Sequence, residues 1–172
     1  MFYALWPDAA VRALIADAAA ALRSSGAARP VPPENYHLTL AFVGDEVPSS
    51  SLAVLQQIGR SQREPACTIS LDAYEHWRES RVVVAVARET PAALTLLSAR
   101  LRAALKDRQA EPPLRAHVTL ARKVAQAPVL QAMSAIEWHA KAFSLVSSDT
   151  HGPRAVYTVV DTWPLLDETP IP

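Results

Sequence analysis

The chain has 172 residues, enough to bury a hydrophobic core and few enough for a single domain spanning 1–172. Lysine plus arginine and aspartate plus glutamate each number 17, so the formal net charge is zero. Proteins that coat long nucleic acids carry a basic excess, because phosphate neutralisation supplies most of their non-specific affinity. The charge balance argues against that class and favours any RNA being held locally, at a terminus or a single nucleotide.

Nothing in the sequence predicts secretion or a membrane span. The apolar run 2–6 is too short for a signal peptide, and the apolar stretch 9–22 is interrupted by charged residues. The one cysteine, Cys67, has no partner for an internal disulfide and lies in an alternating run typical of a strand, so we interpret it as core. We expect a cytoplasmic monomer.

Hydrophobic periodicity predicts a mixture of strands and amphipathic helices. In the first half of the chain we expect a strand at 2–6, a helix from an Asp8 N-cap to about Gly26, a strand at 36–43, a helix at 50–60, and strands at 66–74 and 81–87 joined as a hairpin. In the second half we expect a helix at 92–108, a strand at 116–121, a short helix near 129–135, and strands near 138–146 and 154–161. Apolar residues at three- and four-residue steps define the buried faces of two helices, at Val11, Leu14, Ile15, Ala18 and Leu22 and at Leu94, Leu97, Leu101 and Leu105.

The chain contains an internal repeat. From Pro32 the first half reads PPENYHLTLAF, and from Pro112 the second half reads PPLRAHVTLAR. The two prolines, the histidine, the threonine, the leucine and the alanine recur 80 residues apart, and each block follows a strand and a helix. The repeat predicts an α+β fold of two similar lobes related by a pseudo-two-fold, with antiparallel or mixed sheet in each lobe and helices outside.

Each repeat places a histidine and a threonine on one face of a strand. Side chains at i and i+2 point the same way, so His37 projects with Thr39 and His117 projects with Thr119. If a two-fold relates the lobes, both pairs converge on one cleft. A neutral imidazole there can take a proton from water, an imidazolium can protonate a leaving oxygen, and the hydroxyls can donate to phosphate oxygens. The set suits phosphodiester chemistry.

The paired motifs carry a family resemblance. HLTL at 37–40 and HVTL at 117–120 resemble the motifs of the 2H phosphoesterase superfamily. The longer strings HLTLAFVG and HVTLARK resemble the bacterial RNA 2′,3′-cyclic phosphodiesterases, also called the 2′-5′ RNA ligase family. The resemblance covers essentially the whole chain and implies a bilobed fold with both motifs in a central cleft. It also implies metal-independent opening of an RNA terminal 2′,3′-cyclic phosphate to a 2′-phosphate and a 3′-hydroxyl, with reversible 2′-5′ ligation left open.

Roles for the four motif residues follow from the resemblance. By position, His37 would be the general acid to the 3′-oxygen and His117 the general base on water. The pseudo-symmetry leaves these two roles exchangeable. Thr39 and Thr119 would bind the phosphate.

Two further residues are implied at matching offsets. Arg122 would add a charge-assisted contact to the phosphate, and Phe42 would stack on the terminal base. Both lie five residues beyond their histidine, so strict alternation places them on the opposite face of the strand. They reach the cleft only if the strand ends, twists or bulges there.

Several alternatives stay open. The enzyme could act on a small nucleotide such as an ADP-ribose cyclic phosphate, or the chain could be a non-catalytic RNA-binding module. We expect neither metal nor other cofactor, since no H-x-x-x-H or H-x-H pair with a carboxylate partner occurs. Arg154 and Tyr157 could reach the cleft, and the basic hairpin tip at 78–81 could meet RNA. We expect surface or packing roles for the remaining histidines, His76, His139 and His151.

Overall fold

The computed structural model describes residues 1–23, 29–105, 112–127, 132–149 and 155–167. The elements are β1 (Phe2–Leu5), α1 (Ala9–Arg23), β2 (Arg29–Pro30), η1 (Pro33–Asn35), β3 (Leu38–Phe42), η2 (Ser49–Ser51), α2 (Leu52–Arg60), β4 (Cys67–Leu71), β5 (Ala73–Trp77), β6 (Val82–Val86), α3 (Ala92–Ala104), β7 (His117–Arg122), β8 (Ile136–Ala140), β9 (Ala142–Asp149) and β10 (Val156–Pro164). No helix among these residues has the length and apolarity needed to cross a membrane.

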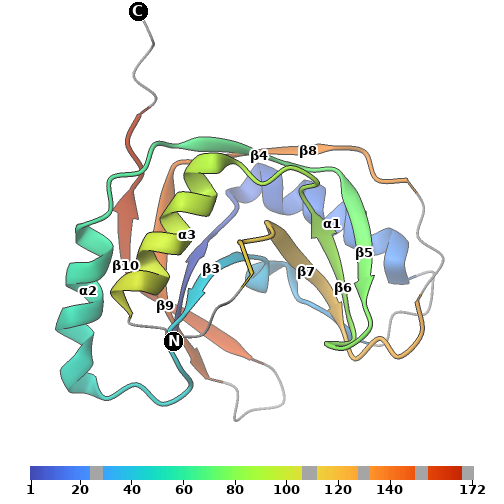
Figure 1. Cartoon of the computed structure of the whole chain (residues 1–172). Coiled ribbons are helices and arrows are strands. Elements are labelled where there is room, and N and C mark those ends of the chain that lie inside the picture. Colours follow the sequence, from blue (N-terminus) through green and yellow to red (C-terminus); the bar gives the residue numbers. More distant parts are fainter. Residues whose placement is uncertain (24–28, 106–111, 128–131, 150–154, 168–172) are drawn as a thin grey trace, which may run out of the picture.

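Two antiparallel sheets form two lobes (Figure 1). Lobe 1 has the strand order β10-β9-β1-β3, and lobe 2 has the order β2-β7-β6-β5. A two-stranded ribbon of β4 and β8 connects them, because β4 leads into β5 of lobe 2 and β8 leads into β9 of lobe 1.

The duplication extends to the pairing of the strands. In lobe 1, Ala4 of β1 lies opposite Thr39 of β3. In lobe 2, Val84 of β6 lies opposite Thr119 of β7. Each residue of this pair stands 80 positions after its counterpart in the lobe 1 pair. The other aligned pairs of these strands follow the same displacement. The predicted α+β fold with two pseudo-symmetric lobes is confirmed.

The two repeats exchange their helices. The helix α1 follows β1 of lobe 1, yet it packs behind lobe 2, where Tyr74 of β5 donates its hydroxyl to the carbonyl of Ala18 (3.0 Å). The helix α3 follows β6 of lobe 2, yet it packs on β3, where the Ser98 hydroxyl donates to the carbonyl of Leu40 (2.6 Å). Figure 1 shows α1 behind β5 and β6, and α3 beside β3. The helix of each repeat therefore packs on the sheet of the other lobe. On lobe 1, α2 also packs on the sheet, where the Tyr3 hydroxyl of β1 donates to the carbonyl of Leu55 (2.7 Å).

The helices begin and pack largely as their sequences predict. Asp8 caps α1, since its Oδ1 accepts a hydrogen bond from the Val11 N–H (2.9 Å). The buried residues of α1 recur at three- and four-residue steps, at Val11, Ile15, Ala19 and Leu22. Leu14, predicted for the same stripe, is 50% exposed, because it lies on the flank of this narrow buried face.

The strand predicted at 66–74 is in fact two strands in different sheets. The chain breaks at Asp72, whose backbone N–H donates to the carbonyl of Val86 (3.0 Å) and whose carboxylate accepts from the Arg88 N–H (3.1 Å). These bonds mark the point where the chain leaves the ribbon and enters lobe 2. The hairpin with the next strand is formed by β5 and β6, with its tip at 78–81.

The structure also differs from two predictions for the second half of the chain, one of a strand and one of a short helix. The strand expected at 138–146 is divided at Lys141 into β8 and β9, where the chain passes from the ribbon into lobe 1. Residues 132–135 of the short helix expected near 129–135 are not helical, and 129–131 lie outside the described residues. The predicted ends of the helices near Gly26 and Arg108 also lie outside them.

Candidate active site

The strands β3 and β7 each carry a bulge at the same position of the repeat. The pairing of β3 with β1 skips Leu40, and the pairing of β7 with β6 skips Leu120. One extra residue in a strand shifts the alternation of all later side chains by one. Phe42 and Arg122 therefore return to the face that carries the histidines and threonines. The bulges are the irregularity that each strand needs if Phe42 and Arg122 are to reach the cleft.

Each bulge is held by a donor outside the sheet ladder. The carbonyl of Leu40 accepts from the hydroxyl of Ser98, which is 1% exposed on α3. The carbonyl of Leu120 accepts from the backbone N–H of Val31 (2.8 Å). Both carbonyls of the skipped residues are thus satisfied, which removes the cost of burying a bare acceptor.

One cavity between the lobes contains the first histidine. A space of about 40 Å³ is lined by His37 with Thr119 and Arg122 of β7, and by Tyr157 of β10. Asn35, Val31 and Ala155 complete its wall. The cavity joins the histidine of lobe 1 to the threonine and arginine of lobe 2.

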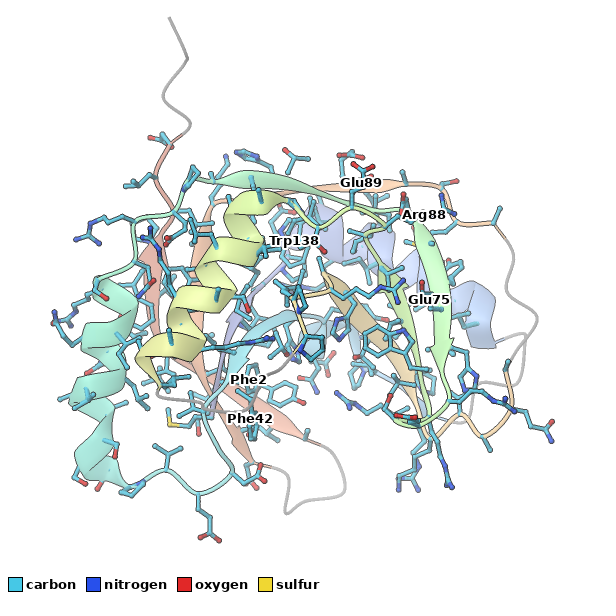
Figure 2. The ribbon with its side chains drawn as sticks, in the orientation of Figure 1. Phe2, Phe42, Glu75, Arg88, Glu89 and Trp138 are labelled. Carbon is cyan, nitrogen blue, oxygen red and sulfur yellow. The ribbon has the colours of Figure 1, made fainter. Side chains whose placement is uncertain are left out.

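A second cavity contains the other histidine. It has a volume of about 400 Å³ and is lined by His117 and Thr39, with the rings of Phe42 and Trp77 and the side chain of Arg115. Phe42 is 54% exposed. Figure 2 shows Phe42 beside Phe2, its partner across the β1–β3 pairing. The structure thus places the six predicted residues in two cavities, each combining a histidine of one lobe with a threonine of the other.

His37 is surrounded by aromatic rings. Its imidazole stacks on Phe2 with 4.9 Å between ring centroids, and lies 5.1 Å from Tyr157 and 5.3 Å from Trp6. Its Nδ1 lies 2.7 Å from the carbonyl oxygen of Asn35. A carbonyl can only accept, so Nδ1 carries the proton and Nε2 is the acceptor of the neutral ring.

His117 is held by a linked group of three neighbours. Its Nδ1 donates to the carbonyl oxygen of Arg115 (2.8 Å), and its imidazole lies 4.5 Å from the indole of Trp77. The Nε1–H of Trp77 donates to the Glu75 carboxylate (2.9 Å), and the same carboxylate pairs with the guanidinium of Arg115. Figure 2 shows Glu75 on β5, in the lobe opposite Phe42. As in His37, Nε2 is the acceptor of the neutral ring.

Burial lowers the pKa of both imidazoles. It lowers the pKa of His37 to about 4, against the opposing effect of the bond to Asn35, and the charges of Arg122 and His117 lower it further. Burial also lowers the pKa of His117, again against its backbone bond, and the guanidinium groups of Arg115 and Arg122 add to the effect. Both rings are therefore neutral acceptors at neutral pH. A bound anion would raise both pKa values by favouring the imidazolium.

Of the other residues considered in the sequence, one lies in the cleft and the rest of the described ones lie away from it. Tyr157 reaches the cleft, whereas Arg154 and His151 lie outside the described residues. The ring of His76 bonds the carbonyl of Val124 (2.9 Å), and that of His139 lies on the surface near Thr68. These are the packing and surface roles expected, and Cys67 is buried in β4.

Sequence reasoning missed several residues around the histidines. Phe2 lies in β1 and Trp6 directly follows it, and simple alternation along 2–6 places both on one face, so extending the repeat to the first strand could have found them. Trp77 and Glu75 gave no comparable signal, because their place depends on the pairing of β5 with β6. Within the described part of the chain, no three His, Cys, Asp or Glu side chains gather closely enough to hold a metal ion.

Comparison with known proteins identifies the family. Residues 6–152 match the 2′-5′ RNA ligase superfamily. The chain is 31% identical over 170 residues to the RNA 2′,3′-cyclic phosphodiesterase of Escherichia coli, covering 96% of both. It is 30% identical over 182 residues to the enzyme of that name from Thermus thermophilus, covering 98% of this chain and 91% of the relative. The crystal structure of E. coli LigT complexed with 3′-AMP is similar with a TM-score of 0.87 at 31% identity, covering 95% of this chain and 96% of that one. The chain therefore belongs to the 2′-5′ RNA ligase superfamily, as its paired motifs predicted.

Proposed function

We propose that this protein is a cytoplasmic, monomeric enzyme that hydrolyses the 2′,3′-cyclic phosphate at an RNA end to a 2′-phosphate and a 3′-hydroxyl. The observation that carries the proposal is the pair of imidazoles, each with Nδ1 bonded to a backbone carbonyl and Nε2 left for the cleft. Two relatives named RNA 2′,3′-cyclic phosphodiesterase, alike over nearly the whole chain, support the substrate class.

The proposed reaction needs one neutral and one protonated histidine. His117 Nε2 accepts a proton from water as the water oxygen attacks phosphorus, and the bond from phosphorus to the 3′-oxygen breaks. His37, protonated when the anionic phosphate binds, gives its Nε2 proton to that oxygen. Thr39, Thr119 and Arg122 donate to the non-bridging oxygens as their charge grows. Each proton transfer contributes about a hundred- to ten-thousand-fold in rate.

The larger cavity accommodates the terminal nucleoside. Its volume of about 400 Å³ lies within the range of small-ligand pockets, and Phe42 and Trp77 offer aromatic faces from opposite lobes. Stacking on an aromatic ring tolerates any base. The enzyme is therefore expected to accept all four terminal bases.

Product mapping on one oligonucleotide ending in a 2′,3′-cyclic phosphate tests the proposal. We expect a 2′-phosphate and a 3′-hydroxyl as the only products, with a rate unchanged by saturating EDTA, because the acid, base and donors are all protein groups. A 3′-phosphate product would contradict the assignment of the leaving oxygen. Turnover of an ADP-ribose cyclic phosphate with inert RNA would favour the small-nucleotide alternative, and RNA binding without turnover would favour the non-catalytic module.

The pH dependence should reflect the lowered pKa values. The productive form carries one proton on the histidine pair, so kcat/KM, which reports the free enzyme, peaks between the two apparent pKa values of the pair. With the pKa of His37 at about 4 and that of His117 lowered from 6.5, this optimum falls below pH 6.5. The bound phosphate raises both values, so the optimum of kcat should lie at higher pH. Coincident profiles with an optimum above pH 7 would contradict this account.

A further inference from the structure

Five exposed cations gather along one edge of lobe 2, although the chain as a whole is neutral. We call this edge, made of Arg29, Arg78, Arg81, Arg122 and Lys123, the basic edge. It comprises β2, the tip of the β5–β6 hairpin and the end of β7. Glu79 is the one acidic residue within the hairpin tip.

Two arginines of the basic edge face one another without a carboxylate between them. Arg29 of β2 lies directly opposite Arg122 of β7, so both side chains project from the same face of the sheet. Like charges opposite one another on neighbouring strands repel. Among the described residues, neither guanidinium has an ion-pair partner. An anion between them would relieve this repulsion.

The chain also bends to place two more cations beside Arg122. Arg122 pairs with Arg29 of β2 along one edge of β7 and with Val82 of β6 along the other edge. Arg81 immediately precedes Val82 in the chain. The backbone N–H of Val124 donates to the carbonyl of Arg81 (2.9 Å), which joins the hairpin tip to the end of β7. Arg81 and Lys123 have positive φ angles of 54° and 60°. This left-handed conformation is uncommon for residues other than glycine, because it brings the Cβ close to a backbone carbonyl oxygen.

The basic edge begins at the reacting phosphate. Arg122 lines the cavity that holds His37 and Thr119, so the positive charge continues outward from that cavity. From β2 to β5 the edge crosses three interstrand spacings, which is roughly 15 Å. That length has room for two or three phosphates of a single strand.

We propose that the basic edge binds backbone phosphates of the same RNA strand whose cyclic end lies in the cleft. The inference rests on the proposed function and deepens it, because it makes the substrate an oligonucleotide rather than a mononucleotide. It also refines the expectation from net charge. The RNA is held at its end, over a few nucleotides instead of one.

Salt dependence measured against substrate length tests the proposal. We would determine KM for a nucleoside 2′,3′-cyclic phosphate and for oligonucleotides of increasing length with the same end, at several salt concentrations. Each phosphate contact adds about 0.7 to the slope of log affinity against log salt for a single strand. We expect the slope to rise by about 1.4–2.1 over the first few added nucleotides and then to stay constant.

Charge-neutralising variants locate the contacts. Arg81→Gln and Lys123→Gln keep a Cβ and long side chain, so they add no backbone strain, and each should lower the oligonucleotide slope by about 0.7. Neither variant should alter kcat or the KM of the mononucleotide. Arg88→Gln is the matched control, since Arg88 is an exposed arginine at the far end of β6 from the hairpin tip (Figure 2). It should leave every parameter unchanged.

The outcomes separate this proposal from the proposed function. If the mononucleotide and the oligonucleotides show the same salt slope while all are hydrolysed, the basic edge does not bind the substrate strand and only this inference fails. If no substrate with a cyclic end is hydrolysed, the proposed function itself fails. If the oligonucleotide slope rises with length but Arg81→Gln and Lys123→Gln both leave it unchanged, the backbone phosphates bind elsewhere and the proposal is overturned.

Discussion

His37→Asn and His117→Asn are each expected to lower kcat by about two orders of magnitude or more while the protein stays folded. The asparagine amide can replace the bond that each Nδ1 makes to the carbonyl of Asn35 or Arg115, so the strand start is retained. It has no group that titrates near neutrality, so proton transfer is lost. Single-turnover kinetics on a cyclic-phosphate oligonucleotide, with circular dichroism of each variant, would measure both effects.

The two histidines should also act as one unit. If one removes a proton and the other supplies one, the double variant should be about as slow as the slower single variant. His139→Asn is the matched control, because His139 is a surface histidine of β8 whose ring lies near Thr68. It should retain full turnover. Near-normal turnover in a folded His117→Asn protein would refute the catalytic assignment.

Gly59→Ala is expected to destabilise the protein by about 1–3 kcal/mol, opposite in sign to the usual effect of this change in a helix. A Cβ at Gly59 in α2 would lie 2.4 Å from two ring carbons of Trp163 in β10. Trp163 cannot move away freely, since it is buried and packs at 5.3 Å from Phe143. Urea unfolding would measure the loss in the free energy of unfolding, and a folded sample should keep its kcat.

A double-mutant cycle isolates this clash. Trp163→Leu removes the atoms that the new methyl group would meet, at the cost of a cavity of its own. In that background Gly59→Ala should cost much less or become stabilising, which gives a coupling energy of about 1 kcal/mol or more. Val54→Ala, at an exposed position of the same helix, serves as the control for propensity alone. Equal costs of Gly59→Ala in both backgrounds would show that the indole is not the cause.

The sequence was most informative where the repeat supplied two independent copies of one pattern. One histidine a few residues after a proline pair predicts little, but His37 and His117 in matched contexts predicted both the lobes and their meeting point. The places of Phe42 and Arg122 could not follow from alternation, because a bulge depends on a donor elsewhere in the fold. Ser98 and Val31 are those donors, and neither carries a signal in its own segment.

Other features depended on tertiary pairing. The polar–apolar alternation of the run 66–74 continues through Asp72, and the pairing of its two halves with β8 and β6 divides the run there. Helix amphipathicity shows that a face is covered, but it does not show by which sheet. The exchange of α1 and α3 was therefore beyond sequence reasoning, as was the arrangement of Trp77 and Glu75 beside His117.

The helix exchange limits what half of this molecule could have been. A chain with only one repeat would lack the exchanged helix that covers part of the outer face of its sheet, and the apolar face of its own helix would lack a sheet. Two such chains could satisfy each other by trading helices, and the resulting symmetric homodimer would bring one histidine from each subunit to the shared axis. Two copies of such a half joined in one chain need no longer be identical, and Phe42 and Arg122 at matching positions of the repeat show the difference that a single chain permits.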